Sequence, residues 1–385
     1  MWHGILIFRV SIRFMPNSPD FVHSDMMVRE LMKALMPFVA MEGATEIIIN
    51  RPCEVFVETG PHWQRFEAPL LTHGHLMSLV RAIAVLSDQE IGPQRPILSA
   101  MLPDGERIQI VLPPAVEADT LSVSIRKPAA SIHSLEHYER EGAFSRFIWA
   151  RAKALTEVTS QLDPVDQSLI KALDDNRLID FLKQAVISKK NIAVVGETGS
   201  GKTTLMKSLC QHIPAYERLM TIEDVRELFL PHHPNRVHLL YSKGGQGVAK
   251  ITPSDLIAAT MRMKPDRVLL AELRGGEAFD FLKLLTTGHS GSITSYHAES
   301  CALAAERYVF MCKEHEDAAI YDAAALKALV TLTLDIIIHV SAKVVCDEKG
   351  QALSKTRFVS EVHFDPIARR KIRFGDAQIH QAWGE

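Results

Sequence analysis

Long apolar runs are absent from this sequence of 385 residues. No stretch approaches the ~18–20 consecutive apolar residues that a membrane-spanning helix requires. Residues 1–20 hold the short apolar run "ILIFRVSIRF", which no small-residue cleavage site follows. We therefore expect an irregular extension over residues 1–20 and not a signal peptide, with a membrane-touching segment as the less favoured alternative.

Cysteine is scarce too. The five cysteines are an odd number, are scattered along the chain and form no CxxC pair. This usage argues against a disulfide framework and a zinc site, and it indicates a reducing compartment. Histidine pairs such as His232 and His233 have no cysteine or acidic partner at ligand spacing, so we expect no metal site built from them.

Charge of one sign is also lacking, because the net charge is only −3. No global positive field is present to hold nucleic acid, so we predict no strong direct nucleic-acid binding. The basic stretch from Arg369 to Arg373 is interpreted as a solvated strand face. With 47% hydrophobic and 23% charged residues, the composition is that of a globular protein and not of a disordered one.

The hydrophobic pattern divides the chain into parts. Residues 21–127 mix helical and alternating patterns and predict a small α+β domain, which ends with the alternating stretch "TLSVSIRKP". Residues 128–170 are weakly patterned and are interpreted as a linker with one or two helices. In residues 171–385, strands alternate with helices, which predicts a mainly parallel sheet with helices on both faces.

One helix of this last part has clear boundary signals. Thr252, Pro253 and Asp255 form a capping box with proline at the first helical position. The helix that they begin is expected to end before Pro265.

The stretch "GETGSGKTTL", from Gly196 to Leu205, predicts a phosphate-binding loop. The β-branched strand "IAVV" precedes it and a helix-forming run follows it, which is the context that such a loop requires. Backbone N–H groups and the helix N-terminus would hold phosphates, Lys202 would contact the β- and γ-phosphates, and the Thr203 hydroxyl would ligate Mg²⁺. The expected nucleotide-binding residues of this loop are Gly196, Glu197, Thr198, Gly199, Ser200, Gly201, Lys202, Thr203 and Thr204.

Hydrolysis also needs a carboxylate that orients water. The apolar strand "VLLAE" ends in Glu272, where a sheet of this kind presents a second acidic residue. The strand end "TIEDVRE" offers Glu223, Asp224 and Glu227. We predict Glu272 and Glu223 as catalytic, one to orient water and the other to hold the metal through its water shell.

The stretch "TTGHSGSITSYHA" adds His289 and His297 on either side of a turn that leads into a strand. We place both at the edge of the sheet that carries the phosphate loop, as candidate sensors of the γ-phosphate.

Other nucleotide-binding classes fit less well. The glycine loop "SKGGQ" does not precede a strand ending in adjacent Asp and Glu, as the signature loop of ABC transporters would. The NKxD motif of GTPases is absent, and a whole predicted domain precedes the phosphate loop, which is unusual for a small-molecule kinase.

Four blocks in this order resemble the hexameric traffic ATPases of bacterial type IV secretion and conjugation, relatives of the type II secretion and pilus-retraction motors. The blocks are "GETGSGKTTL", "TIEDVREL", "MRMKPDRVLLAELRGGEAFDFL" and "TGHSGSITSYHA". "SIRKP" and "ELRGGEA" favour the type IV secretion branch. The resemblance spans residues 42–299. Ala271 departs from it, because many members have glycine before the catalytic glutamate.

The resemblance implies a fold and further site residues. It implies an α/β protein with an N-terminal α+β domain, a linker and a RecA-like P-loop domain with a mainly parallel sheet flanked by helices, with nucleotide bound between the domains. Arg107 and Arg126 match family arginines that reach the γ-phosphate, where a guanidinium suits the spreading charge. The blocks also give Asp224, Arg274 and His289 as nucleotide-contacting residues and His297 as catalytic.

The function that the resemblance implies is an ATP-driven motor for the assembly of a type IV secretion channel or for substrate export through it, with ATP and Mg²⁺ as cofactors. It implies a homo-hexamer at the cytoplasmic face of the bacterial inner membrane, peripherally associated, with other secretion components as partners. Three alternatives stay open: a nucleotide-gated assembly scaffold with little turnover, a pilus or type II secretion motor, and a nucleic-acid translocase. The net charge of −3 argues against the last of these.

Overall fold

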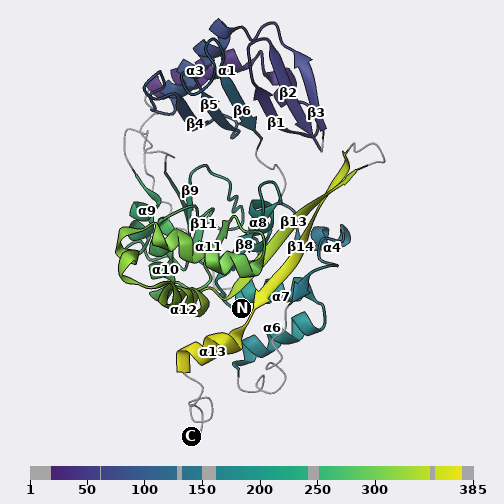
Figure 1. Ribbon diagram of the computed structural model, residues 1–385, viewed down its shortest axis with the longest axis vertical. Helices are drawn as coiled ribbons and strands as arrows, with labels where there is room; N and C mark the ends of the chain where they lie inside the picture. The colour runs from purple at the N-terminus through teal and green to yellow at the C-terminus, as the bar shows by residue number, and fades with distance from the viewer. Residues whose placement is uncertain are drawn as a thin grey trace, which may run out of the picture.

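The structure is a computed structural model that describes residues 19–60, 62–127, 132–149, 162–241, 251–346 and 352–374. In this part of the chain, two β-sheets form separate layers, one from the N-terminal third and one from the remainder (Figure 1). The first 18 residues, most of the predicted extension, lie outside the described residues, as does the loop "SKGGQ".

The smaller sheet has six antiparallel strands in the order β3-β2-β1-β6-β5-β4. Its strands are β1 (Ala44–Ile49), β2 (Glu54–Thr59), β3 (His62–Glu67), β4 (Ile97–Met101), β5 (Arg107–Val111) and β6 (Ser122–Arg126). The helices beside it are α1 (Pro19–Met32), α2 (Met36–Val39) and α3 (His73–Leu86). Ile47 and Ile49 are fully buried, as the period of two predicts for a sheet covered on one face. The predicted hairpin with its turn at residues 103–105 is present as β4 and β5.

The larger sheet has eight strands in the order β10-β9-β11-β12-β8-β13-β14-β7. These strands are β7 (Ile148–Trp149), β8 (Ile192–Val195), β9 (Leu219–Glu223), β10 (Arg236–Leu240), β11 (Arg267–Leu270), β12 (Ile293–Tyr296), β13 (Ile336–Cys346) and β14 (Ala352–Phe364). The first six strands in this order, β10-β9-β11-β12-β8-β13, are parallel to one another, and β14 runs antiparallel to β13. Every residue of β8, β11 and β12 is buried, because helices cover both faces.

The helices of the larger unit form two layers, one on each face of the sheet. They are α4 (Leu135–Arg140), α6 (Pro164–Asp174), α7 (Leu178–Ile187), α8 (Lys202–Cys210), α9 (Pro253–Thr260), α10 (Glu277–Thr286), α11 (Cys301–Lys313), the 3-10 helix η2 (Glu316–Ile320), α12 (Ala323–Thr333) and α13 (Pro366–Phe374). One core lies between the sheet and α6 to α8, and a second lies between the sheet and α9 to α12. The predicted α/β class, with a mainly parallel sheet flanked by helices, is confirmed.

The predicted linker takes part in the larger unit where the structure describes it. Leu135 and Phe144 are buried in the core beside α7 and α8, and β7 pairs in parallel with β14 at the edge of the sheet. The exact division of the chain at residues 127 and 170 stays a prediction. The packing shows that these residues also complete the sheet that follows them.

Two features of the C-terminal part differ from the sequence interpretation or lie beyond it. The basic stretch Arg369–Arg373 is helix α13 and not a strand, because Pro366 stands in the first turn and Asp365 Oδ1 accepts the backbone N–H of Ala368. Strands β13 and β14, which we did not predict, form a long antiparallel hairpin that rises from the body of the larger unit toward the smaller sheet (Figure 1).

Candidate active site

The phosphate loop joins the buried strand β8 to helix α8 at the carboxyl end of the sheet. Gly196, Gly199 and Gly201 have φ values of 152°, 72° and 99°, which other residues rarely adopt. Gly201 is the residue that caps α8, so the helix begins at Lys202. The glycines therefore let the chain curl around the helix N-terminus, where backbone N–H groups can hold an anion.

One observation shows why Gly196 carries no side chain, and a second shows that the loop fits a phosphate group. A Cβ atom added at Gly196 would lie 2.1 Å from the Val340 carbonyl oxygen, so a side chain there would displace the loop. The Ser200 Oγ atom is buried and has no hydrogen-bond partner among the described residues. An oxyanion within the loop would give that hydroxyl a partner.

The side chain of Lys202 reaches back into the loop, and the residue is only 7% exposed. Its Nζ atom donates to the carbonyl oxygens of Gly196 at 3.0 Å and Glu197 at 2.8 Å, and lies 3.3 Å from His297 Nδ1. Burial lowers the pKa of Lys202 to about 8, while the Glu272 carboxylate opposes that change. The ammonium is thus held where the negative charge of a bound phosphate would offset the cost of burying it.

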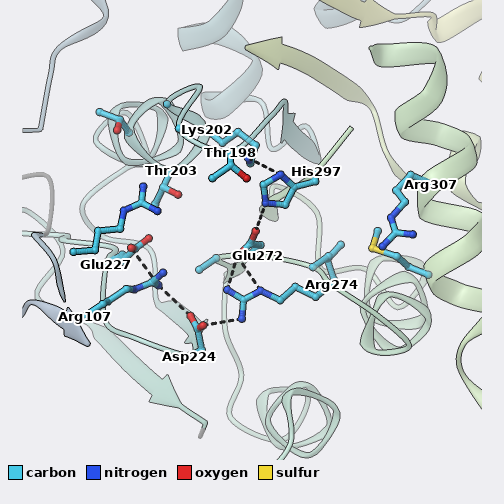
Figure 2. Close-up of a pocket in the computed structure, with 17 residues that line it drawn as sticks. Arg107, Thr198, Lys202, Thr203, Asp224, Glu227, Glu272, Arg274, His297 and Arg307 are labelled. Carbon is cyan, nitrogen blue, oxygen red and sulfur yellow. Dashed lines mark hydrogen bonds and ion pairs between the residues drawn. The ribbon is translucent and has the colours of Figure 1, made fainter. Parts of the chain in front are cut away.

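A cleft of about 420 Å³ opens between the two sheets next to this loop (Figure 2). Its floor is made by the loop, by Thr203 and Thr204 of α8, and by residues after β9, β11 and β12. The smaller sheet contributes Arg107 from β5 and Arg126 from β6. Ligands of open α/β sheets bind beyond the carboxyl ends of the strands, which is where this cleft lies.

Side chains in the cleft form a connected chain of polar contacts (Figure 2). Glu272 Oε1 lies 3.0 Å from His297 Nε2, and Glu272 Oε2 accepts from Arg274 Nη2 at 2.5 Å. Arg274 Nη1 donates to Asp224 Oδ2 at 2.7 Å. Burial alone would raise the pKa of Asp224, but Arg107 and Arg274 outweigh it and hold this pKa below its usual value.

Arg107 links the smaller sheet to the acidic residues after β9. Its Nη2 atom lies 3.1 Å from Asp224 Oδ1 and 3.1 Å from Glu227 Oε1. Arg126 lines the same cleft, but its Nε atom lies 3.5 Å from Glu46 Oε1 on the neighbouring strand. The two arginines that the resemblance singled out therefore both face the phosphate loop, each next to a carboxylate of the protein.

Two predicted site residues are placed elsewhere. Glu223 is fully buried below the cleft, and its carboxylate accepts the backbone N–H groups of Glu227 at 2.6 Å and Leu228 at 2.8 Å. It therefore fixes the loop that carries Asp224 and Glu227. His289 precedes β12, so it lies at the opposite edge of the sheet, where its Nδ1 atom is 3.1 Å from Thr287 Oγ1. Placing His289 beside the phosphate loop was wrong, because a residue just before a parallel strand lies at the amino end of that strand, and the phosphate loop lies at the carboxyl end.

The structure adds Arg307 and Met311 of α11 to the cleft lining. Their stretch, "ERYVFMCK", has no motif that could have signalled this role. The cleft reaches them because α11 packs against α10 and beside β13, close to the carboxyl end of the sheet.

The fold and this cleft together define a P-loop nucleotide-binding protein with a second sheet across the site. The chain matches the family model described as "Type II/IV secretion system protein" over residues 153–376. It is 42% identical to the type IV secretion system protein VirB11 of Brucella suis biovar 1 (strain 1330) over 367 residues, 93% of this chain and 98% of that protein. It therefore belongs to the type II/IV secretion system protein family.

Two further comparisons agree. The type IV secretion system protein PtlH homolog of Bordetella bronchiseptica (strain ATCC BAA-588 / NCTC 13252 / RB50) is 43% identical over 313 residues, 81% of this chain and 89% of that protein. The crystal structure of the VirB11 ATPase from the Brucella suis type IV secretion system, in complex with sulphate, covers 92% of this chain and 99% of that one, with 42% identity and a TM-score of 0.50. The recognition made from the four sequence blocks is confirmed.

Proposed function

We propose that this chain hydrolyses ATP as a motor of a type IV secretion system and that it works as a homo-hexamer at the cytoplasmic face of the bacterial inner membrane. One observation carries the proposal: the phosphate loop and two arginines of the other sheet, Arg107 and Arg126, line one cleft. Family membership supports a role with other secretion components. Among the described residues, no helix has the length and apolar character to cross a bilayer.

The phosphate loop would hold the triphosphate through its N–H groups, the N-terminus of α8 and the Lys202 ammonium. The oxygen donors in the cleft suit Mg²⁺, a hard cation. Thr203 would be a ligand, and Asp224 and Glu227 are carboxylates in the same cleft. When bound, Mg²⁺ supplies neutralisation of the phosphate charge.

Glu272 is the residue that we propose to orient the attacking water. Its partner His297 has a lowered pKa, chiefly through burial, so the imidazole is neutral at pH 7. In the neutral form Nε2–H donates to Glu272 Oε1 and Nδ1 accepts from the Lys202 ammonium, which satisfies both contacts. His297 would thus connect Lys202 to Glu272, so that a movement of the Lys202 ammonium would change the position of the Glu272 carboxylate.

Arg107 would convert this chemistry into movement. In the structure its guanidinium is shared between Asp224 and Glu227. A γ-phosphate is a stronger competitor for a guanidinium than a carboxylate, because it carries more charge and more acceptor atoms. ATP would therefore draw Arg107, and the smaller sheet with it, toward the loop, and phosphate release would return it to the carboxylates.

The test uses two variants in the full chain. Lys202→Ala should abolish ATP turnover, and Glu272→Gln should bind ATP yet lower kcat by about 10²–10⁴-fold. Substrate export by the secretion system should fail with both. If Glu272→Gln still supports export, the assembly-scaffold interpretation replaces the motor. Turnover that Lys202→Ala leaves unchanged would contradict the ATPase site itself, and a mass in solution of one subunit with nucleotide would contradict the ring.

A further inference from the structure

Each glycine of the phosphate loop lies against the β13–β14 hairpin. A Cβ atom added at Gly196 would meet the Val340 carbonyl oxygen of β13 at 2.1 Å. One added at Gly199 would lie 3.2 Å from Lys355 Nζ, and one added at Gly201 would lie 3.1 Å from Arg357 Cδ, both on β14. The hairpin thus packs against the loop, and the three hairpin residues that make these contacts do not line the cleft.

The sheet itself directs Arg357 toward the loop. Alternate residues of a strand share a face, so Arg357 points the same way as Val359, two positions on. Val359 is 2% exposed and belongs to the core beside α8. Its backbone N–H is bonded to the Ala143 carbonyl at 2.9 Å, which fixes this part of β14. A rigid strand therefore presents the guanidinium to the loop.

Arg357 makes one directed contact there: its Nε–H donates to the Gly199 carbonyl oxygen at 3.2 Å. In a trans peptide the C=O and the following N–H point in opposite directions. The Ser200 N–H therefore points away from Arg357, and it donates to the Glu197 carbonyl oxygen within the loop at 3.3 Å. Phosphate oxygens would be held by N–H groups with this inward direction.

We propose that Arg357 is a positioning residue of the ATPase site, which holds the Gly199–Ser200 peptide in its phosphate-binding orientation and couples the hairpin to nucleotide binding. The inference rests on the proposed function of the loop and names a residue outside the four sequence blocks. Arg357 does not line the cleft, so it acts through the loop and not on the nucleotide. Lys355, close to Gly199, adds a second positive charge on the same side.

The expected signature is weaker nucleotide binding with the chemical step kept. Without the Arg357 contact the peptide can rotate, and binding must then restore its orientation. Glu272 and His297 are untouched by the change, so kcat stays near the wild-type value while KM rises. This pattern is expected when an interaction is lost that stabilises the bound substrate and the transition state equally. We expect Arg357→Ala to raise the Kd for ADP with magnesium about five- to tenfold.

The experiment measures ADP binding by titration calorimetry and ATP turnover for the wild type, Arg357→Ala and Arg357→Lys. Lysine should recover part of the affinity, because its ammonium can donate to the carbonyl but lacks the planar geometry of arginine. Lys343→Ala is the matched control: it removes an exposed cation from the same hairpin, on β13, and should bind ADP as the wild type does. Thermal unfolding of each variant verifies the fold.

An Arg357→Ala variant whose Kd for ADP stays within twofold of the wild type would overturn the proposal. So would an equal loss in Lys343→Ala, or a fall in kcat with unchanged ADP binding. If Arg357→Ala does not fold, Arg357→Lys carries the test under the same criteria, with a measurable loss expected. Failure of the proposed function would look different: the wild type would then lack turnover that depends on Lys202, whatever Arg357 does to ADP binding.

Discussion

At the scale of single residues, the cleft alternates positive and negative groups. Arg274 lies between two carboxylates, Glu272 and Asp224, and Arg107 contacts the second of them from the other sheet. Each carboxylate is thus held in place by a neighbouring guanidinium. Glu272, the residue proposed to orient water, owes its position to this pairing and to His297.

Arg274→Gln should lower kcat about 10²-fold, because Glu272 Oε2 loses both hydrogen bonds from Arg274 and a small misplacement of a catalytic group is costly. ATP binding should change little, since Lys202 and the loop remain. Steady-state kinetics and ADP titration separate the two effects. Arg262→Gln, an exposed arginine of the same unit, is the control, and an equal kcat in both variants would contradict the role of Arg274.

A second residue-scale prediction concerns stability. Arg267 is fully buried, and its Nε and Nη2 atoms donate to Glu217 at 2.6 Å and 3.0 Å. Arg267→Met leaves the Glu217 carboxylate buried without this partner, and we expect a loss of about 3–5 kcal/mol in the free energy of unfolding. The exposed Lys189 ammonium, 3.7 Å from Glu217, compensates only in part.

Denaturant unfolding measures this loss, and the double variant Arg267→Met/Glu217→Leu provides the comparison. Replacing a buried ion pair by apolar side chains is often close to neutral, so the double variant should recover most of the stability. If it is as unstable as the single variant, shape and not charge decides at this site.

At the scale of helices and strands, sequence motifs that lie within a few residues of each other predicted the starts of helices correctly. The capping box of α9 is present as predicted, with Thr252 and Asp255 bonded reciprocally and proline in the first turn. The helix after the phosphate loop begins at Lys202, where the glycines end. Such motifs act within a few residues, so the sequence alone is sufficient to place them.

Elements that depend on distant partners were not predictable in the same way. Strands β13 and β14 mix polar and apolar residues, and they are strands because they pair with each other and β13 with β8. In the cleft, the motifs predicted the loop, Glu272 and His297, but not Arg307, which the packing of α11 brings there. The burial of Glu223 likewise follows from the tertiary fold and not from its motif.

The hairpin also makes the fold sensitive to acid. His339 of β13 is 5% exposed, its Nδ1 atom lies 2.5 Å from Ser360 Oγ, and its pKa is lowered, chiefly by burial. The unfolded chain takes up a proton near pH 6.5 that the folded chain resists, so the free energy of unfolding falls as pH drops below 6.5. We expect His339 to contribute to this loss between pH 7.5 and 5.5.

Urea unfolding of the wild type and His339→Gln at both pH values tests this. The variant should lose less stability on acidification than the wild type, because glutamine does not titrate. Other histidines with lowered pKa values act on both proteins alike. Equal losses in the two proteins would show that His339 does not contribute.

At the scale of the whole molecule, the two sheets face each other across the cleft, which charged residues of both units line. Arg107 is the described residue that bonds one unit to the acidic residues of the other, at Asp224 and Glu227. This contact is ionic and involves a single arginine side chain, so a phosphate can compete with the carboxylates for its guanidinium. The proposed motor depends on this exchange.

Strand β7 determines how the chain can be truncated without exposing a strand edge. Its residues Ile148 and Trp149 cover the outer edge of β14, and the Trp149 indole N–H donates to the Phe364 carbonyl at 3.4 Å. A truncated chain starting at residue 162 leaves that edge unpaired, and bare strand edges recruit other chains. It should aggregate on concentration, while one starting at residue 132 should stay monodisperse by light scattering. Equal behaviour would mean that two residues are too few to guard the edge.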